Sequence, residues 1–287
     1  MMRSLLFVPA DSERKLAKAF DSGADAIALD LEDAVQPSRK ALARDMLRSW
    51  LAARLDHTGL WVRVNDVKSG ELLRDLTHIV PSRPAGILLP KISGPEDVSL
   101  VGHYLEALEA EHELATGHIR ILAIVTETPL GVLRLGELAG QRHPRISHVS
   151  WGAEDLSAAL GAGDPRAADG EWRPTYAYAR SQCLLTAHAL GAEALDTIHV
   201  NFRDLDGLRK SCRAARYDGF TGRLAIHPDQ IPVINEEFTP SESERAHAKR
   251  IVDAFRCGAG AVSIDGKMYD IPHLRAARRL LGDPDTE

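Results

Sequence analysis

The segment ILAIVTETPLG, residues 121–131, carries the pattern from which we predict the fold. Its first half is a run of aliphatic residues, which predicts a strand buried on both faces. Glu127 follows at the end of this run, where its carboxylate is expected to be buried. Because an unpaired buried charge is costly, Glu127 requires a partner. The identity of that partner is the first question that the sequence raises.

Similar apolar runs recur along the chain and alternate with segments of helical periodicity. We predict strands at residues 4–10, 26–32, 60–65, 86–91, 119–127, 146–152, 197–201 and 222–228, and helices at residues 11–22, 37–55, 69–79, 94–115, 129–140, 172–190 and 204–217. Buried strands that alternate with helices indicate a parallel sheet of the α/β class, and about eight such units predict a closed (β/α)₈ TIM barrel. A doubly wound open sheet is the alternative, disfavoured because no GxGxxG follows the first strand.

The end of the chain departs from this alternation, so we divide the protein into a catalytic barrel domain, residues 1–240, and a C-terminal extension, residues 241–287. A capping box at Ser241 predicts a helix start. An Asp-Gly pair at 265–266 predicts a hairpin, and Pro272 fits the first turn of a final helix. A barrel closes without this tail, so we expect the helical and hairpin extension to pack on the rim or on a neighbouring subunit.

Composition and charge exclude several classes of protein. The chain has 287 residues, a net charge of −6 and a hydrophobic fraction of 44%, which are ordinary values for a globular protein. We find no long basic run, no apolar stretch of membrane-spanning length and no signal peptide. Its three cysteines match neither a disulfide framework nor a zinc site. We therefore expect a cytoplasmic protein with reduced thiols, no nucleic-acid partner and no membrane partner.

Polar side chains gather at the predicted strand ends, which form the active-site mouth of a (β/α)₈ barrel. They are Asp30, Glu32, Asp33, Arg63, Asn65, Lys91, Glu127, Glu154 and Asp155, with His199 and His227 in the last two predicted strands. Glu127 and Asp155 follow successive strands, so both can reach one point, and paired oxygen ligands suit Mg²⁺. The alternative, which the pattern leaves open, is that both residues simply begin helices.

Arg63, Lys91 and the acidic residues at 30–33 each have two interpretations. Arg63 either binds a substrate carboxylate with its fork of donors or forms a rim salt bridge with Asp30 or Glu127. The acidic residues either hold metal-bound waters or lie in a solvated turn. Lys91 either forms a Schiff base with a carbonyl substrate or neutralises the mouth carboxylates, and we favour the second.

Taken in order, several stretches resemble the HpcH/HpaI aldolase family, and within it the branch similar to the citrate lyase β-subunit. They are SLLFVPADSERKLAKA, ADAIALDLEDAV, WVRVN, GILLPK, TETPLGVL, WGAEDLSAALG, GFTGRLAIHPDQIPVINEEFTPS and GKMYDIPHLRAA, which span nearly the whole chain. The resemblance implies a TIM barrel, usually a homotrimer, with Mg²⁺ at its mouth. It implies a carbon–carbon lyase of the oxo-acid-lyase or aldolase type. Such an enzyme cleaves or forms a citryl, malyl or citramalyl thioester of coenzyme A or acyl carrier protein, through a metal-stabilised enolate.

The resemblance also implies roles for individual residues. Glu127 and Asp155 match the metal ligands, Arg63 matches a substrate-binding arginine, and Asp270 matches an acidic residue that a neighbouring subunit contributes as catalytic acid or base. Positions that contact the thioester substrate in similar proteins are Phe7, Arg14, Lys18, Ile226 and His227, beside Arg63 and Glu127. Arg14, Lys15 and Lys18 near the start of the first helix also suit a phosphate-bearing ligand. As an alternative, Asp270 only caps the final helix.

Two other classes of function stay open at this point. One is a metal-independent aldolase that uses Lys91 as a Schiff base. The other is a non-catalytic subunit, for example within a citrate lyase complex. The acyl group, the thioester carrier and the assignment of acid and base are also left open by the sequence.

Overall fold

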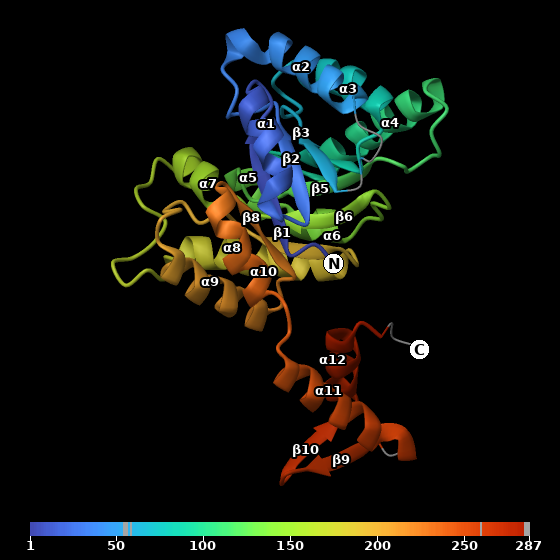
Figure 1. The fold of residues 1–287 in the computed structure, drawn as a ribbon, viewed down its shortest axis with the longest axis vertical. Helices are drawn as coiled ribbons and strands as arrows, with labels where there is room; N and C mark the ends of the chain where they lie inside the picture. The colour runs from blue at the N-terminus through green and yellow to red at the C-terminus, as the bar shows by residue number, and fades with distance from the viewer. Residues whose placement is uncertain (54–56, 58, 259, 284–287) are drawn as a thin grey trace. The chain divides into compact units, whose positions relative to one another are not determined.

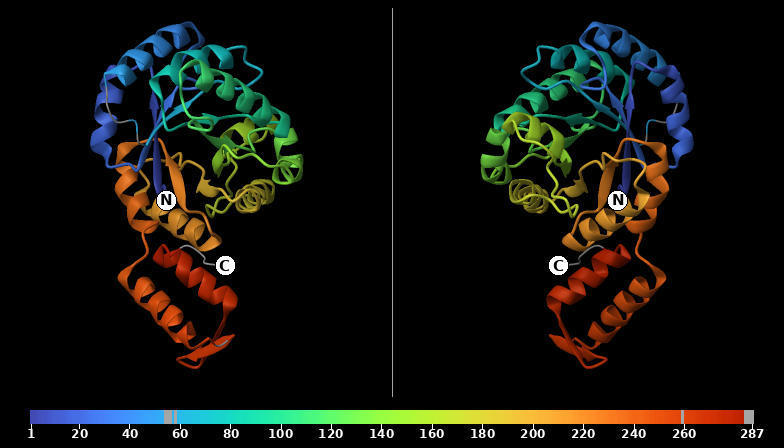
Figure 2. Two further views of the ribbon diagram at one scale, coloured as in Figure 1. Left: turned by 90° about the vertical axis from the view of Figure 1, so that its right-hand side faces the viewer. Right: turned by 90° about the vertical axis from the view of Figure 1, so that its left-hand side faces the viewer.

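The computed structural model describes residues 1–53, 57, 59–258 and 260–283. Within them, eight parallel strands pair in chain order, and β8 pairs with β1 to close a barrel. Helices surround the strands (Figures 1 and 2). The predicted (β/α)₈ barrel is therefore confirmed.

The elements of the barrel follow the predicted alternation. The strands are β1 Ser4–Pro9, β2 Ala26–Asp30, β3 Leu60–Arg63, β4 Gly86–Leu89, β5 Arg120–Ile124, β6 Ile146–Ser150, β7 Glu193–Asp196 and β8 Gly222–Ala225. The helices are α1 Glu13–Ala19, α2 Lys40–Ala52, α3 Leu72–Ile79, α4 Pro95–Glu111, α5 Pro129–Leu133, α6 Leu135–Ala139, α7 Ala153–Leu160, α8 Pro174–Ala189, α9 Leu205–Asp218 and α10 Ile231–Glu237. Short 3₁₀ turns include η4 Pro228–Gln230, which follows β8.

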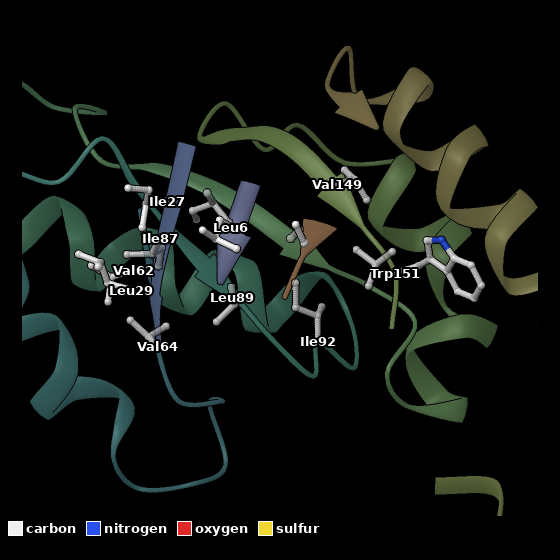
Figure 3. Close-up of a cluster of buried hydrophobic side chains, with 14 of the residues drawn as sticks. Leu6, Ile27, Leu29, Val62, Val64, Ile87, Leu89, Ile92, Val149 and Trp151 are labelled. Atoms are coloured by element: carbon white, nitrogen blue, oxygen red, sulfur yellow. The ribbon is translucent and has the colours of Figure 1, made fainter. Parts of the chain in front are cut away.

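Successive residues of each strand face two different apolar layers. Leu5 belongs to a small cluster inside the barrel, whereas Leu6 belongs to the larger layer between strands and helices. Figure 3 shows part of this larger layer, with Leu29 and Leu89 from neighbouring parts of the sheet. Both faces are covered, which explains why the strands read as continuous apolar runs.

The structure differs from the predicted elements in three respects. The predicted strand at 197–201 is wrong, because β7 is Glu193–Asp196 and the later residues turn toward the barrel mouth. The predicted helix at 129–140 is two short helices, α5 and α6, that meet at Arg134. Helices α7 and α10 were not predicted as elements. The last two residues of the predicted helix 37–55 lie outside the described residues.

The C-terminal part, Thr239–Glu287, is a separate compact unit. It contains α11 Glu242–Ala254, the antiparallel hairpin β9 Ala261–Ile264 and β10 Lys267–Asp270, and α12 Ile271–Leu281. Each predicted feature is present: Ser241 forms a capping box, the turn lies at 265–266, and Pro272 is in the first turn of α12. The unit has its own apolar cluster, which includes Phe255 and Leu274. Its packing on a rim or a neighbour stays a prediction.

Among the described residues, no helix combines the length and apolar character needed to cross a membrane.

Candidate functional site

A cavity of about 490 Å³ lies at the mouth of the barrel. Of the residues selected from the sequence, those that line it are Phe7, Lys15, Lys18, Asp30, Arg63, Glu127, Glu154, Asp155, Ile226 and His227. Glu32, Asp33 and Lys91 are joined to this set by ion pairs. Arg14 is exposed and is not among the described residues that line the cavity.

Glu127 is buried, with 4% of its surface exposed. Its Oε2 accepts a hydrogen bond of 2.5 Å from the backbone N–H of Lys91. Gly152 leaves room for it, because a Cβ there would lie 2.6 Å from the Glu127 Cγ. Burial raises the pKa of Glu127 well above its usual value, and the negative charge of Asp155 raises it further. Ionised Glu127 therefore needs more positive charge than one backbone amide supplies.

Arg63 ends β3 and pairs with Asp30, its register partner at the end of β2. Its Nε and Nη2 donate to the two carboxylate oxygens of Asp30 at 2.8 and 2.5 Å, and its Nη1 lies 3.0 Å from Glu32. The guanidinium also lies over the Phe7 ring, 4.7 Å from its centre. Burial lowers the pKa of Arg63, but Asp30 and Glu32 outweigh it and hold the pKa above its usual value. The salt bridge with Asp30 that we considered is thus present.

Lys91 follows β4, and its ammonium lies among three carboxylates. Nζ is 2.5 Å from Glu32, 2.8 Å from Asp33 and 3.6 Å from Asp155. Burial lowers the pKa of Lys91, but hydrogen bonds to Asp33 and Glu32 and the nearby charges outweigh it and raise the pKa. A Schiff base requires a neutral amine, so this setting disfavours that chemistry and favours the role of counter-cation.

The donor set suits Mg²⁺ rather than a transition metal. Among the described residues there is no group of three or more His, Cys, Asp or Glu side chains arranged to hold a metal. Glu127 and Asp155 supply carboxylates to one cavity, where the charge of Asp155 contributes to the raised pKa of Glu127. Mg²⁺ is commonly held by one or two carboxylates and keeps several waters. The residues present therefore fit this ion.

Behind the mouth, Asp196 at the end of β7 is the centre of a buried network that the sequence analysis missed. It accepts hydrogen bonds from Trp151 Nε1 at 2.7 Å and from the backbone N–H of Thr197. It also forms ion pairs with Arg180 and Arg223. Trp151 directly precedes Gly152, so this network fixes the segment that leads to Asp155. The misplaced strand at 197–201 concealed the signal, because Asp196 was not recognised as a strand end.

The opposite side of the cavity is shaped by the turn after β8. Gln230 Oε1 accepts the backbone N–H groups of Ile226 and His227 at 2.9 and 3.1 Å, which fixes this turn. The His227 ring stacks on Phe202 with a centroid distance of 4.7 Å. His227 therefore presents an aromatic surface beside the apolar Ile226, and Lys18 adds a positive charge to the same cavity.

Asp270 belongs to the C-terminal unit, where it occupies the N-cap position of α12. Its Oδ1 lies 2.5 Å from Nδ1 of His273, which lowers the pKa of the carboxyl. The capping position that we considered is present within the unit. The catalytic role of Asp270 stays a prediction.

The comparison with known families decides the family. A family model described as HpcH/HpaI aldolase/citrate lyase matches residues 3–228. The chain belongs to this family. A family relative, the mitochondrial citramalyl-CoA lyase of Rattus norvegicus, is 33% identical over 298 residues, covering 97% of this chain and 85% of the relative. A (3S)-malyl-CoA thioesterase of Cereibacter sphaeroides (strain ATCC 17025 / ATH 2.4.3) is 35% identical over 292 residues, covering 99% and 95%.

Solved structures place this HpcH/HpaI family member in the predicted branch. The CitE protein of Mycobacterium tuberculosis, crystallised with magnesium, acetoacetate and coenzyme A, is 34% identical. The match covers 98% of this chain and 97% of that chain, with a TM-score of 0.82. The predicted resemblance to the citrate lyase β-subunit-like branch is confirmed.

Proposed function

We propose that the protein is a Mg²⁺-dependent carbon–carbon lyase that acts on a 3-hydroxyacyl thioester of coenzyme A, with citramalyl, malyl and citryl groups as candidates. The observation that carries this proposal is the pair Glu127 and Asp155, two carboxylates that line one cavity beside Arg63. The magnesium and coenzyme A in the CitE complex and the names of the relatives support the choice of metal and carrier.

In this reaction the bond between C2 and C3 of the acyl chain breaks. The 3-hydroxyl group loses its proton as an oxo group forms, and negative charge develops on the acetyl thioester fragment until its carbon is protonated. Mg²⁺ bound by Glu127 and Asp155 would supply Lewis-acid polarisation of the substrate oxygens. Arg63 directs its guanidinium into the same cavity, where a fixed positive charge stabilises the charge that develops.

The same cavity also has a surface that matches the thioester carrier. Lys15 and Lys18 place positive charge there, which suits phosphate groups, and Phe7, Ile226 and His227 supply apolar and aromatic contacts. We assign proton transfer to Asp270 of a neighbouring subunit in a homotrimer. This assignment rests on the family resemblance alone and is tested below.

The test is a panel of citramalyl-, malyl- and citryl-CoA, each assayed for release of acetyl-CoA and the matching oxo acid. We expect one of them to be cleaved with Mg²⁺ and not with EDTA. Glu127→Ala should lose this activity, because it removes a ligand, while the surface variant Glu137→Ala keeps it. Circular dichroism checks that both variants fold. Full turnover in EDTA, or borohydride trapping of substrate on Lys91, would contradict the proposal.

A second activity is favoured by the malyl-CoA thioesterase relative. Hydrolysis of the thioester bond releases free coenzyme A and leaves the hydroxy acid intact. The same panel separates the two activities when free thiol and acetyl-CoA are measured together. Free thiol without acetyl-CoA would identify a thioesterase.

A further inference from the structure

Lys91 contacts both proposed metal ligands through different groups. Its backbone N–H holds Glu127, and its ammonium lies 3.6 Å from Asp155. The residue has a φ of 54°, in the left-handed region that most side chains avoid. This conformation lets one residue after β4 serve both carboxylates at once.

We propose that the Lys91 ammonium is a counter-cation at Asp155 that a divalent ion displaces, and that it then remains with Glu32 and Asp33. The inference rests on the proposed metal site and adds a positioning residue to it. The contact with Asp155 is the longest of its three carboxylate contacts, whereas Glu32 and Asp33 are at 2.5 and 2.8 Å. A divalent ion at Asp155 repels the ammonium, so this contact is the first to be lost.

The arrangement has a measurable consequence for metal affinity. Carboxylates that share a site repel each other, and Lys91 relieves that repulsion while no metal is present. The same positive charge opposes an incoming divalent ion. Removing it leaves the metal site more negative, so metal should bind more tightly. Glu32 keeps a second cationic partner, Arg63 at 3.0 Å, so the acidic turn retains one anchor in such a variant.

Lys91→Met isolates the ammonium. Methionine is unbranched and similar in length, and it keeps the backbone N–H that holds Glu127. The matched control is Lys68→Met, because Lys68 is an exposed lysine after β3 whose Nζ donates to Ser93. Lys91→Arg keeps the charge. Mn²⁺ affinity is measured on the substrate-free protein by electron paramagnetic resonance, which needs no turnover.

We expect Lys91→Met to bind Mn²⁺ about tenfold more tightly than the wild type at low ionic strength, with the ratio shrinking as salt is added. Lys68→Met and Lys91→Arg should stay within about twofold of the wild type. Unchanged or weaker Mn²⁺ binding by folded Lys91→Met would overturn the inference. A wild type that binds no Mn²⁺ would instead overturn the proposed metal site, so the two failures are distinguishable.

A second measurement uses the wild-type chain, so it decides the question even where Lys91→Met does not fold. The lysine ¹⁵Nζ resonances are recorded during a Mg²⁺ titration, and the Lys91 signal is assigned by its loss in Lys91→Arg. We expect that signal to move with metal occupancy while the Lys68 signal stays in place. A Lys91 resonance that does not respond at saturating Mg²⁺ would overturn the inference.

Discussion

Arg63 reaches the mouth cavity while both of its terminal nitrogens and Nε contact carboxylates of the barrel. Arg63→Lys keeps the charge but cannot form the two parallel bonds to Asp30. We expect the variant to lose roughly 2–4 kcal/mol of transition-state stabilisation, which lowers kcat/KM by about 30- to 900-fold. Steady-state kinetics with the cleaved thioester measure this loss. Arg39→Lys, which alters an exposed arginine paired with Asp11, should leave it unchanged.

Near wild-type kinetics for Arg63→Lys would mean that Arg63 only forms a salt bridge at the rim of the barrel. Thermal unfolding of the same variant separates the two effects. Loss of the pair with Asp30 alone would lower the stability of the variant. A variant that unfolds at the wild-type temperature and yet loses kcat/KM therefore identifies a role of Arg63 toward the substrate.

At the residue scale, the sequence predicted those site residues whose position follows from the end of a strand. Glu127, Asp155 and Arg63 were placed at one mouth because each follows a buried run, and the structure brings them to one cavity. The contact between the Lys91 N–H and Glu127 was not predictable, since it depends on a left-handed backbone at a lysine. Lysine is not among the residues enriched in that conformation, so the sequence gives no signal for it at this position.

At the scale of elements, the predicted position of β7 was too late in the chain, because apolar and β-branched residues continue past the end of the strand. Residues 197–201 have strand-like composition, yet Ile198 lines the mouth cavity rather than pairing in the sheet. Apolar composition indicates that a segment is buried, but it does not distinguish a buried strand from a buried loop. Asp196 marks the true end, where it joins β7 to α8 and β8 through Arg180 and Arg223.

The Asp196 network gives a prediction on acid stability. Burial opposes ionisation of Asp196, but Arg223 and Arg180 outweigh it and lower its pKa from 3.8 to about 2. The folded-state pKa is below the unfolded value, so this stabilisation is complete above about pH 4 and is lost as the pH falls through about 2. Asp196→Asn leaves two arginines without their buried partner and should cost about 3–5 kcal/mol at pH 7.

Urea denaturation of wild type and Asp196→Asn at several pH values measures this effect. The difference in unfolding free energy should shrink by about 2 kcal/mol between pH 4 and pH 2. Asp218→Asn is the matched control, because Asp218 pairs with the same Arg180 but is exposed. That variant should change stability by less than about 1 kcal/mol. A constant difference across this pH range would contradict the lowered pKa.

At the scale of the whole molecule, the barrel was predictable because strand burial and helical periodicity repeat around a closed sheet. The elements of the C-terminal unit were predictable from local signals, namely a capping box, an Asp-Gly turn and an early proline. The surface against which that unit packs was not predictable, because local signals carry no information on its partner.

The last prediction tests whether Asp270 completes the site of a neighbouring subunit. Asp270→Asn and Glu127→Ala should each be inactive alone, because every site of the proposed homotrimer then lacks one residue. In an equal mixture, about one quarter of the sites combine an intact Glu127 with an intact Asp270 from the neighbour. We therefore expect about a quarter of the wild-type activity to return. Native mass spectrometry must confirm that subunits exchange. If Asp270 acts within its own chain, exchanged mixtures recover nothing. If it only caps α12, folded Asp270→Asn stays active alone. Either result refutes the shared site.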